Sequence, residues 1–365
     1  MNLPQTNIEP GNSQTTQWAR FNYLFIGIAD LSPAYFALVM ATGIVSIAAH
    51  LFKYTLFAET LFYVNILAYA ILCILFIARF ICYKKKFLSD FMDDRKNMGF
   101  LSFVAANCIL GTQFVLIANH CHVAIYFFVI GLSSWIFLTY SLFAVLIEKR
   151  SKPSLKAISG TWLLLIVATQ AVSILSVQLE GYFPFSHEKV LFLSLIFFMC
   201  GSMFYIIMIT LIIYRLIFFN QQAEDLAPSY WINMGADAIT VLAGSTLMLS
   251  ADKWQFLSEL LPFLKGFTLL FWAIGTWWIP LILILGVWRH IEKKVPLKYN
   301  SQYWGMVFPL GMYTVCTVSL SQAIGLPFLM GISSVFVFFA IGAWAIVFIG
   351  LISSIGFSAL IKGRL

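Results

Sequence analysis

Hydrophobic residues occupy long, nearly uninterrupted runs along most of the chain, and short polar segments separate these runs. Apolar runs of roughly 18 or more residues are long enough to cross a bilayer as helices. Ten such spans are predicted. They lie near 32–52, 57–82, 98–118, 123–147, 157–179, 189–218, 228–250, 262–288, 302–323 and 327–358. The pattern therefore predicts an all-α integral membrane protein.

Composition agrees with this prediction. Of the 365 residues, 61% are hydrophobic and only 10% are charged, whereas about 25% are charged in a soluble domain. We expect one membrane domain over 31–360, after a polar segment at 1–30 and before a short end at 361–365. The polar segment lacks the short apolar core of a signal peptide, so we expect it to be retained.

The basic residues predict the orientation. All but four of the 22 Lys and Arg residues fall on one side of the predicted spans, and the exceptions are Lys53, Lys189, Lys253 and Lys265. Basic residues collect in cytoplasmic loops, so both termini are expected in the cytoplasm. The net charge of +7 then reflects topology and anionic lipid headgroups, and no nucleic-acid partner is expected.

Odd and even spans differ in composition. Even spans consist almost entirely of large apolar residues, as in "NILAYAILCILFIARFICY", while odd spans are rich in small and polar residues, as in "VMATGIVSIAA". Lipid-facing helices favour uniform apolar surfaces, and helices that pack closely or line a wet path favour Gly, Ala, Ser, Thr, Asn and Gln. The alternation predicts five helical hairpins, with odd helices around a central pore and even helices outside.

Small and polar residues of the odd spans are the predicted pore lining. These candidates are Thr42, Asn107, Gly111, Thr169, Gln170, Asn233 and Gly235. The alternative is that they form packing interfaces, in which small side chains let helices approach each other. Helical periodicity places such residues on one face of a helix. A pore lining and a packing interface would both occupy one face, so the periodicity leaves both interpretations open.

Asp237 is an ionisable residue deep inside the seventh span. A charge at mid-bilayer costs about 2.5–3.5 kcal/mol on insertion scales, which makes such a residue a functional candidate. It is a possible site of proton coupling. The alternative is a carboxyl group that is hydrogen-bonded to Asn233 or to a neighbouring helix.

The ninth span contains the segment "YWGMVFPLGMYTVCT". Pro309 removes a backbone hydrogen bond, so it and Gly311 predict a kink beside the bulky Phe308. An aromatic ring at such a position can close a narrow axis by its size and by excluding water. Phe308 is therefore the predicted gate, and an ordinary packing aromatic is the alternative.

No catalytic, metal or cofactor site is predicted, and the protein is not expected to be an enzyme. The stretch "NHCH" (119–122) is expected to be a surface loop, because adjacent residues do not easily all face one ion. The stretch "DDRKN" (93–97) lacks the later acid of a magnesium-binding motif, and we expect a solvated run of charges.

Four stretches resemble the tellurite-resistance/dicarboxylate transporter family, which includes bacterial tellurite-resistance proteins, malate permeases, sulfite pumps and plant slow anion channels. They are "LSPAYFALVMATGIVS", "SGTWLLLIVATQ", "PSYWINMGADAIT" and "YWGMVFPLGMYT". The resemblance extends over nearly the whole chain. It implies ten helices as five quasi-repeated hairpins, a homotrimer with one pore in each protomer, and a gating phenylalanine at Phe308.

These observations predict an anion channel or transporter of the bacterial inner membrane that passes small anions or C4-dicarboxylates. No intramembrane Lys or Arg is available to hold an anion tightly, which favours a channel-like path. The alternative is a proton-coupled carrier of a C4-dicarboxylate such as malate, or of sulfite, that uses Asp237.

Overall fold

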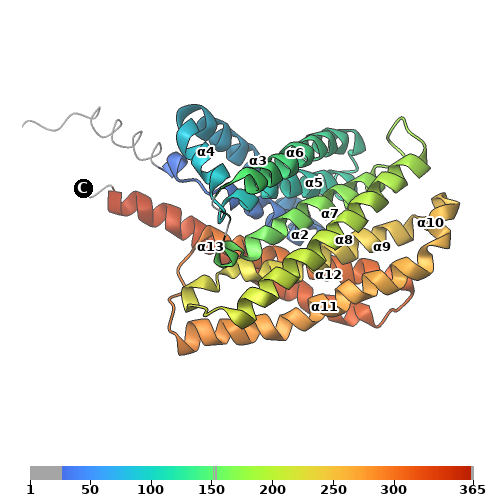
Figure 1. Ribbon diagram of the computed structural model, residues 1–365. Helices are drawn as coiled ribbons and strands as arrows, with labels where there is room; N and C mark the ends of the chain where they lie inside the picture. Colours follow the sequence, from blue (N-terminus) through green and yellow to red (C-terminus); the bar gives the residue numbers. More distant parts are fainter. Residues whose placement is uncertain (1–26, 151, 153, 363–365) are drawn as a thin grey trace, which may run out of the picture.

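The computed structural model describes residues 27–150, 152 and 154–362. Most of the predicted polar segment 1–30, and residues 363–365 of the predicted C-terminal end, lie outside the described residues. The described part is helical and contains no strand. It includes ten helices that are long and apolar enough to cross a membrane, as the sequence predicts (Figure 1).

The ten spans form five consecutive hairpins, each made of an inner and an outer helix. The inner helices are α2 (Ala37–Leu51), α5 (Leu101–Leu116), α7 (Leu164–Gln178), α9 (Ile232–Leu249) and α12 (Trp304–Ile324). The outer helices are α3 (Thr55–Cys82), α6 (Cys121–Glu148), α8 (His187–Phe218), α11 (Leu261–Val287) and α13 (Leu329–Lys362). In an 18-residue apolar stretch of each span, 78–94% of the residues are buried in the inner spans and only 17–44% in the outer spans. The predicted division into inner and outer helices is confirmed.

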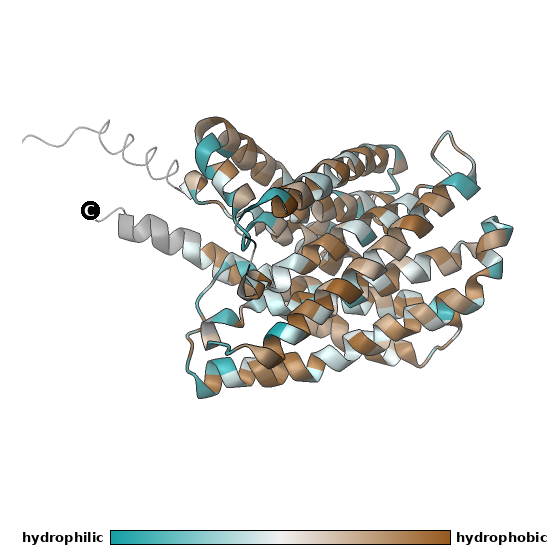
Figure 2. Cartoon of the chain, viewed as in Figure 1, coloured by the Kyte–Doolittle hydropathy of each residue, from teal (hydrophilic) through white to brown (hydrophobic). Residues whose placement is uncertain are grey.

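The inner helices form a closed ring. Each of them packs against the next one along the chain, and α12 returns to pack against α2. Each outer helix packs on the inner helix of its own hairpin, and its brown, hydrophobic residues dominate the outside of the molecule in Figure 2. All five inner helices begin with a 3₁₀ turn on the same side of the molecule. The turns are Pro33–Phe36, Asn97–Phe100, Gly160–Leu163, Pro228–Trp231 and Ser301–Tyr303.

One hydrogen bond recurs in every hairpin. A Trp or Tyr of the outer helix donates to a polar side chain on the inner helix of the next hairpin around the ring. The donors and acceptors are Tyr69 and Asn107, Trp135 and Thr169, Tyr205 and Asp237, Trp272 and Thr317, and Trp344 and Thr42. The donor–acceptor distances are 2.8, 2.8, 2.7, 3.0 and 3.0 Å in that order. We call these five contacts the seam bonds, because each crosses the seam between two neighbouring hairpins.

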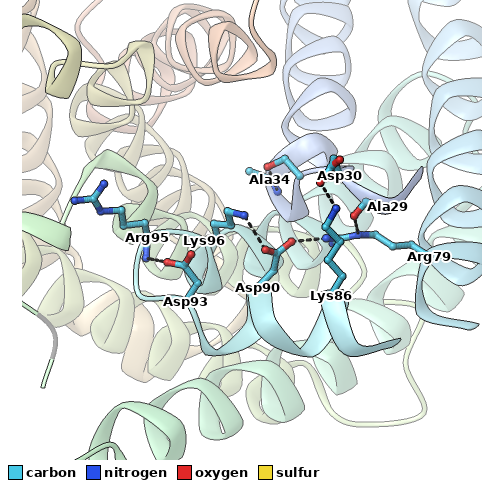
Figure 3. A network of polar contacts seen from close by, with 10 residues as sticks. Ala29, Asp30, Ala34, Arg79, Lys86, Asp90, Asp93, Arg95 and Lys96 are labelled. Carbon is cyan, nitrogen blue, oxygen red and sulfur yellow. Dashed lines mark hydrogen bonds and ion pairs between the residues drawn. The ribbon is translucent and has the colours of Figure 1, made fainter. Parts of the chain in front are cut away.

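The side on which the inner helices begin is held by ion pairs, and we call it the basic side. A short helix, α4 (Lys84–Met92), follows α3 there. Its Asp90 pairs with Arg79 of α3 and, at 2.8 Å, with Lys96 (Figure 3). Burial would raise the pKa of Asp90, but the hydrogen bonds from Lys96 and Arg79 outweigh it and lower this pKa. The pairs join α3, α4 and the start of α5.

The stretch at 93–97 is not the solvated run of charges that the sequence predicts. Asp94 pairs with Lys149, at the end of α6, at 2.7 Å, and Lys149 also donates to the Met92 carbonyl. Asp93 accepts from the backbone N–H of Arg95 at 2.9 Å (Figure 3). The acids are only partly exposed, because they join the segment before α5 to the end of α6.

A second cluster lies on the opposite side of the molecule. Glu180, just after α7, accepts from Lys253 at 2.6 Å and also contacts His187 at the start of α8. Burial would raise the pKa of Glu180, but the hydrogen bonds from Lys253 and His187 lower it below its ordinary value of 4.5. The cluster joins the ends of the third and fourth hairpins.

We predict that the seam bonds contribute measurably to stability. Replacement of Trp344 by Phe and of Thr42 by Val should each lower the free energy of unfolding, and the coupling energy between the two replacements should be about 0.6 kcal/mol, with an upper limit near 1.7. The double variant should lose less than the sum of the two. Trp277→Phe is the matched control, since Trp277 is 57% exposed on an outer helix. Fully additive losses in denaturant titrations of detergent-solubilised protein would contradict the prediction.

We also predict that Glu180 contributes to acid sensitivity. A lowered pKa in the folded state means that this stabilisation is present above pH 4.5 and is lost as the pH falls through the folded value. The Glu180→Gln variant should therefore lose less melting temperature than the wild type between about pH 7 and pH 3. Glu259→Gln, at an exposed glutamate on the same side, should follow the wild type. Parallel melting curves for Glu180→Gln and the wild type would exclude this role.

Candidate functional site

A cavity of about 170 Å³ lies inside the ring and is lined by residues from all five inner helices. We call it the ring cavity. Each inner helix contributes at least three residues at helical spacing, so one face of every inner helix is directed toward the axis. None of the lining side chains in the described part of the chain is charged.

The middle of the ring cavity is apolar, and one end of it is polar. Four isoleucines, at positions 44, 109, 174 and 239, line it at a constant separation of 65 residues, and Met312 occupies the corresponding place on α12. Further along, toward the ends of the inner helices, the lining includes the polar residues Thr112, Gln178, Thr246 and Ser319 beside aliphatic ones such as Leu51 and Leu116. Gln178 has a buried amide oxygen without a partner. The polar side chains of the lining are therefore found at this end of the cavity, which we call the polar end.

Phe308 does not line the ring cavity; it lies one helical turn before the lining residue Met312, toward the basic side. It precedes Met312 by four residues in α12, which places both on the same helix face. Phe308 is 1% exposed. Its ring lies against α9 at Gly235, where an added Cβ would be 3.4 Å from Phe308 Cδ1. A bulky aromatic side chain thus lies between α12 and α9, one turn from the apolar middle of the cavity.

The residues of the predicted kink pack closely against neighbouring inner helices. α12 continues as a helix through Pro309. A Cβ added at Gly235 would lie 2.8 Å from Pro309 Cγ, and one added at Gly311 would lie 2.8 Å from Ile44 Cγ2 of α2. These two glycines allow α12 to approach α9 on one side and α2 on the other.

Most of the predicted lining residues lie at the seams between inner and outer helices. Thr42, Asn107 and Thr169 are acceptors of seam bonds. Gln170 donates to the Phe198 carbonyl of α8 at 3.1 Å. Gly111 adjoins Leu175 and Phe127. The ring cavity is lined by other residues of the same helices. The contacts of these five predicted residues are therefore those of a packing interface between helices.

Asp237 and Asn233 also lie on the outer side of α9. Asp237 is fully buried, and its Oδ2 accepts from Tyr205 of α8, whose hydroxyl in turn accepts from Trp278 of α11 at 3.3 Å. Its Oδ1 has no partner. Asn233 is fully buried and neither polar atom of its side chain has a partner. The Asp237 carboxyl group therefore accepts a hydrogen bond from the neighbouring helix α8 and not from Asn233. Asn233 lines a second cavity, which lies outside the ring.

Sequence reasoning missed the seam-bond donors and the isoleucines of the ring cavity. The donors Tyr69, Trp135, Tyr205, Trp272 and Trp344 recur in the outer helices at near-equal separations. The isoleucines recur every 65 residues. A search for aromatic and isoleucine positions shared by the five hairpins would have found both sets.

Comparison with known proteins identifies the family of the chain. The family model described as voltage-dependent anion channel, SLAC1, matches residues 30–352, which include all five hairpins. The chain belongs to this family. The SLAC1 family corresponds to the tellurite-resistance/dicarboxylate transporter family that the sequence resembles, so that recognition is confirmed.

Several relatives of this SLAC1-family chain are similar over much of its length. Two uncharacterized transporters of Methanocaldococcus jannaschii are 26% and 27% identical over 299 and 296 residues, which cover 80% and 78% of this chain and 84% and 82% of the relatives. An uncharacterized membrane protein of Mycobacterium tuberculosis is 36% identical over 148 residues, 40% of this chain and 75% of the relative. The SLAC1-family chain is thus a multi-pass membrane protein of an anion channel and transporter family.

Proposed function

We propose that this SLAC1-family protein conducts small anions or C4-dicarboxylates along the axis of the ring, and that Phe308 closes this path. The observation that carries the proposal is the ring cavity, to which all five inner helices contribute. The assignment of Phe308 is supported by its position one helical turn before the lining residue Met312. In this proposal the path runs from the polar end through the isoleucines and Met312 to Phe308.

The chemistry of the lining supports conduction in preference to tight binding. Hydroxyl and amide dipoles stabilise a passing anion weakly, whereas an Arg or Lys would hold it. The apolar middle favours a dry closed state, because a narrow hydrophobic constriction excludes water. Movement of one aromatic ring and a few aliphatic side chains would then change both the width and the hydration of the path.

The setting in the cell is part of the proposal. The excess of Lys and Arg on the basic side supports a cytoplasmic location for that side and for both termini. We place the protein in the inner membrane of a bacterium, and we propose a homotrimer with one path in each protomer, as the family resemblance implies. Tellurite resistance is a further possible outcome of such transport.

We predict that Phe308→Ala raises anion flux into proteoliposomes by about tenfold or more, equivalent to a barrier lowered by about 1.4 kcal/mol. The physical reason is removal of the ring that lies one helical turn from the apolar constriction. Phe338→Ala is the matched control, since Phe338 is 63% exposed on α13. Reversal potentials in planar bilayers with chloride, nitrate, sulfite and malate would identify the preferred anion. An unchanged flux in a correctly folded Phe308→Ala protein would remove the gate assignment.

A proton-coupled carrier of malate or sulfite is the second candidate function. The buried Asp237, with an unpartnered Oδ1 and a hydrogen bond from Tyr205, favours it. Its position on the outer side of α9 argues against direct contact with a solute in the ring cavity. Any coupling would therefore act through the packing of α9 against α8 and α11.

The two functions differ in their response to a pH gradient. A carrier should accumulate malate in vesicles with an imposed pH gradient, and Asp237→Asn should abolish that accumulation, because an amide does not take up a proton in this pH range. A channel should only equilibrate malate with its electrochemical gradient. We expect the channel result, with uptake by Asp237→Asn similar to the wild type.

A further inference from the structure

A larger cavity of about 410 Å³ lies outside the ring, between the inner helices α9 and α12 and the outer helices α11 and α13. We call it the lateral cavity. No residue lines both this cavity and the ring cavity. Its size falls in the range of small-molecule sites, roughly 300–1,000 Å³. It is therefore distinct from the proposed conduction path.

The interior of the lateral cavity is apolar and opens toward the bilayer. Trp278 of α11, Met306 of α12 and Ile346 of α13 line it. Ile346 is also 72% exposed on the outer surface of the membrane domain. A side chain that both lines the cavity and faces outward marks a lateral opening. Gly286 of α11 lines the cavity as well, and an added Cβ there would have no atom within 4 Å.

The mouth of the lateral cavity on the basic side carries three basic side chains, Arg289, His290 and Lys298. His290 donates from Nδ1 to the Val295 carbonyl at 2.8 Å, which leaves Nε2 available. Arg289 donates to the Leu226 carbonyl, and its Nε has no partner. The nearby Glu292 lies 3.5 Å from Lys293. The mouth thus presents the positive charges of Arg289 and Lys298, and the Nε–H of Arg289 is a donor without a partner.

Asn233 gives independent support for a ligand. It lines the lateral cavity, is fully buried, and has no partner for its amide nitrogen or its amide oxygen. A buried polar group without a partner is unfavourable, because it has lost its hydrogen bonds to water. A ligand with polar atoms could form hydrogen bonds to the Asn233 amide, whereas a hydrocarbon alone could not.

We propose that the lateral cavity binds one anionic phospholipid from the basic-side leaflet. The phosphate would lie at Arg289, His290 and Lys298, polar ester groups would reach Asn233, and an acyl chain would enter through the opening at Ile346. Basic pockets between transmembrane helices on the cytoplasmic side are suited to anionic headgroups. The lipid would contact Met306, two residues before Phe308, so its occupancy is positioned to influence the start of α12.

The proposal is tested by lipid binding to purified full-length protein, which does not depend on transport. The probes are phosphatidylglycerol, phosphatidylcholine with the same acyl chains, and inorganic phosphate, and the readouts are retained lipid in native mass spectrometry and the shift in melting temperature. We expect one tightly retained phosphatidylglycerol per chain and a stabilising shift. Phosphatidylcholine and phosphate should give neither.

Variants locate the site. Lys298→Gln removes an exposed charge and should weaken phosphatidylglycerol binding about fivefold, equivalent to about 1 kcal/mol for one basic side chain near the membrane. Gly286→Leu fills the cavity and should weaken binding by about tenfold or more. Gly266→Leu is the matched control on the same helix, because an added Cβ at Gly266 also has no atom within 4 Å and Gly266 does not line the cavity.

Three results would overturn the proposal. Wild-type affinity in Gly286→Leu would place the lipid elsewhere. Equal retention of phosphatidylcholine would show that the basic mouth does not select the headgroup. Equal stabilisation by inorganic phosphate would indicate a site for a free anion and not for a lipid. None of these outcomes bears on whether Phe308→Ala raises flux, so the two proposals fail separately.

Discussion

The five seam bonds set the orientation of the inner helices. Each joins an aromatic donor of one hairpin to a polar acceptor of the next, and the last, from Trp344 to Thr42, joins the final hairpin to the first. In a bilayer a polar side chain has few other partners, so its bond partner fixes the rotation of its helix. With the polar acceptors held outward, the opposite, mostly aliphatic faces of the inner helices are directed to the axis.

This arrangement leaves the ring cavity of the described chain without a charged lining residue. The one acidic side chain in the described inner helices, Asp237, is held outward by Tyr205. The isoleucines and Met312 therefore form an apolar middle section, and hydroxyl and amide groups are confined to one end of the ring cavity. Under the proposed function, the field that an anion meets comes from backbone and side-chain dipoles, which act over a short distance and release the ion readily.

The sequence predicts the spans and the division into inner and outer helices, because long apolar runs and the contrast between small and large residues are strong one-dimensional signals. It does not predict which neighbour a polar stripe meets. Thr42, Asn107 and Thr169 have the composition of a pore lining, yet their partners are Trp and Tyr residues of other hairpins. The lateral cavity also cannot be predicted from periodicity, since its residues come from four helices (α9, α11, α12 and α13) and from the segments at 226–231 and 288–303.

The order of helices around the ring has a consequence for biosynthesis. The ring is complete only when α12 packs between α9 and α2, and α12 is the last inner helix to leave the ribosome. The same helix carries Phe308. A partly synthesised chain that lacks α12 therefore has an incomplete ring of inner helices. The helix that completes the ring, α12, also contains Phe308, the proposed gate. Under the proposed function, the passage and its closure would therefore arise in one step during insertion into the membrane.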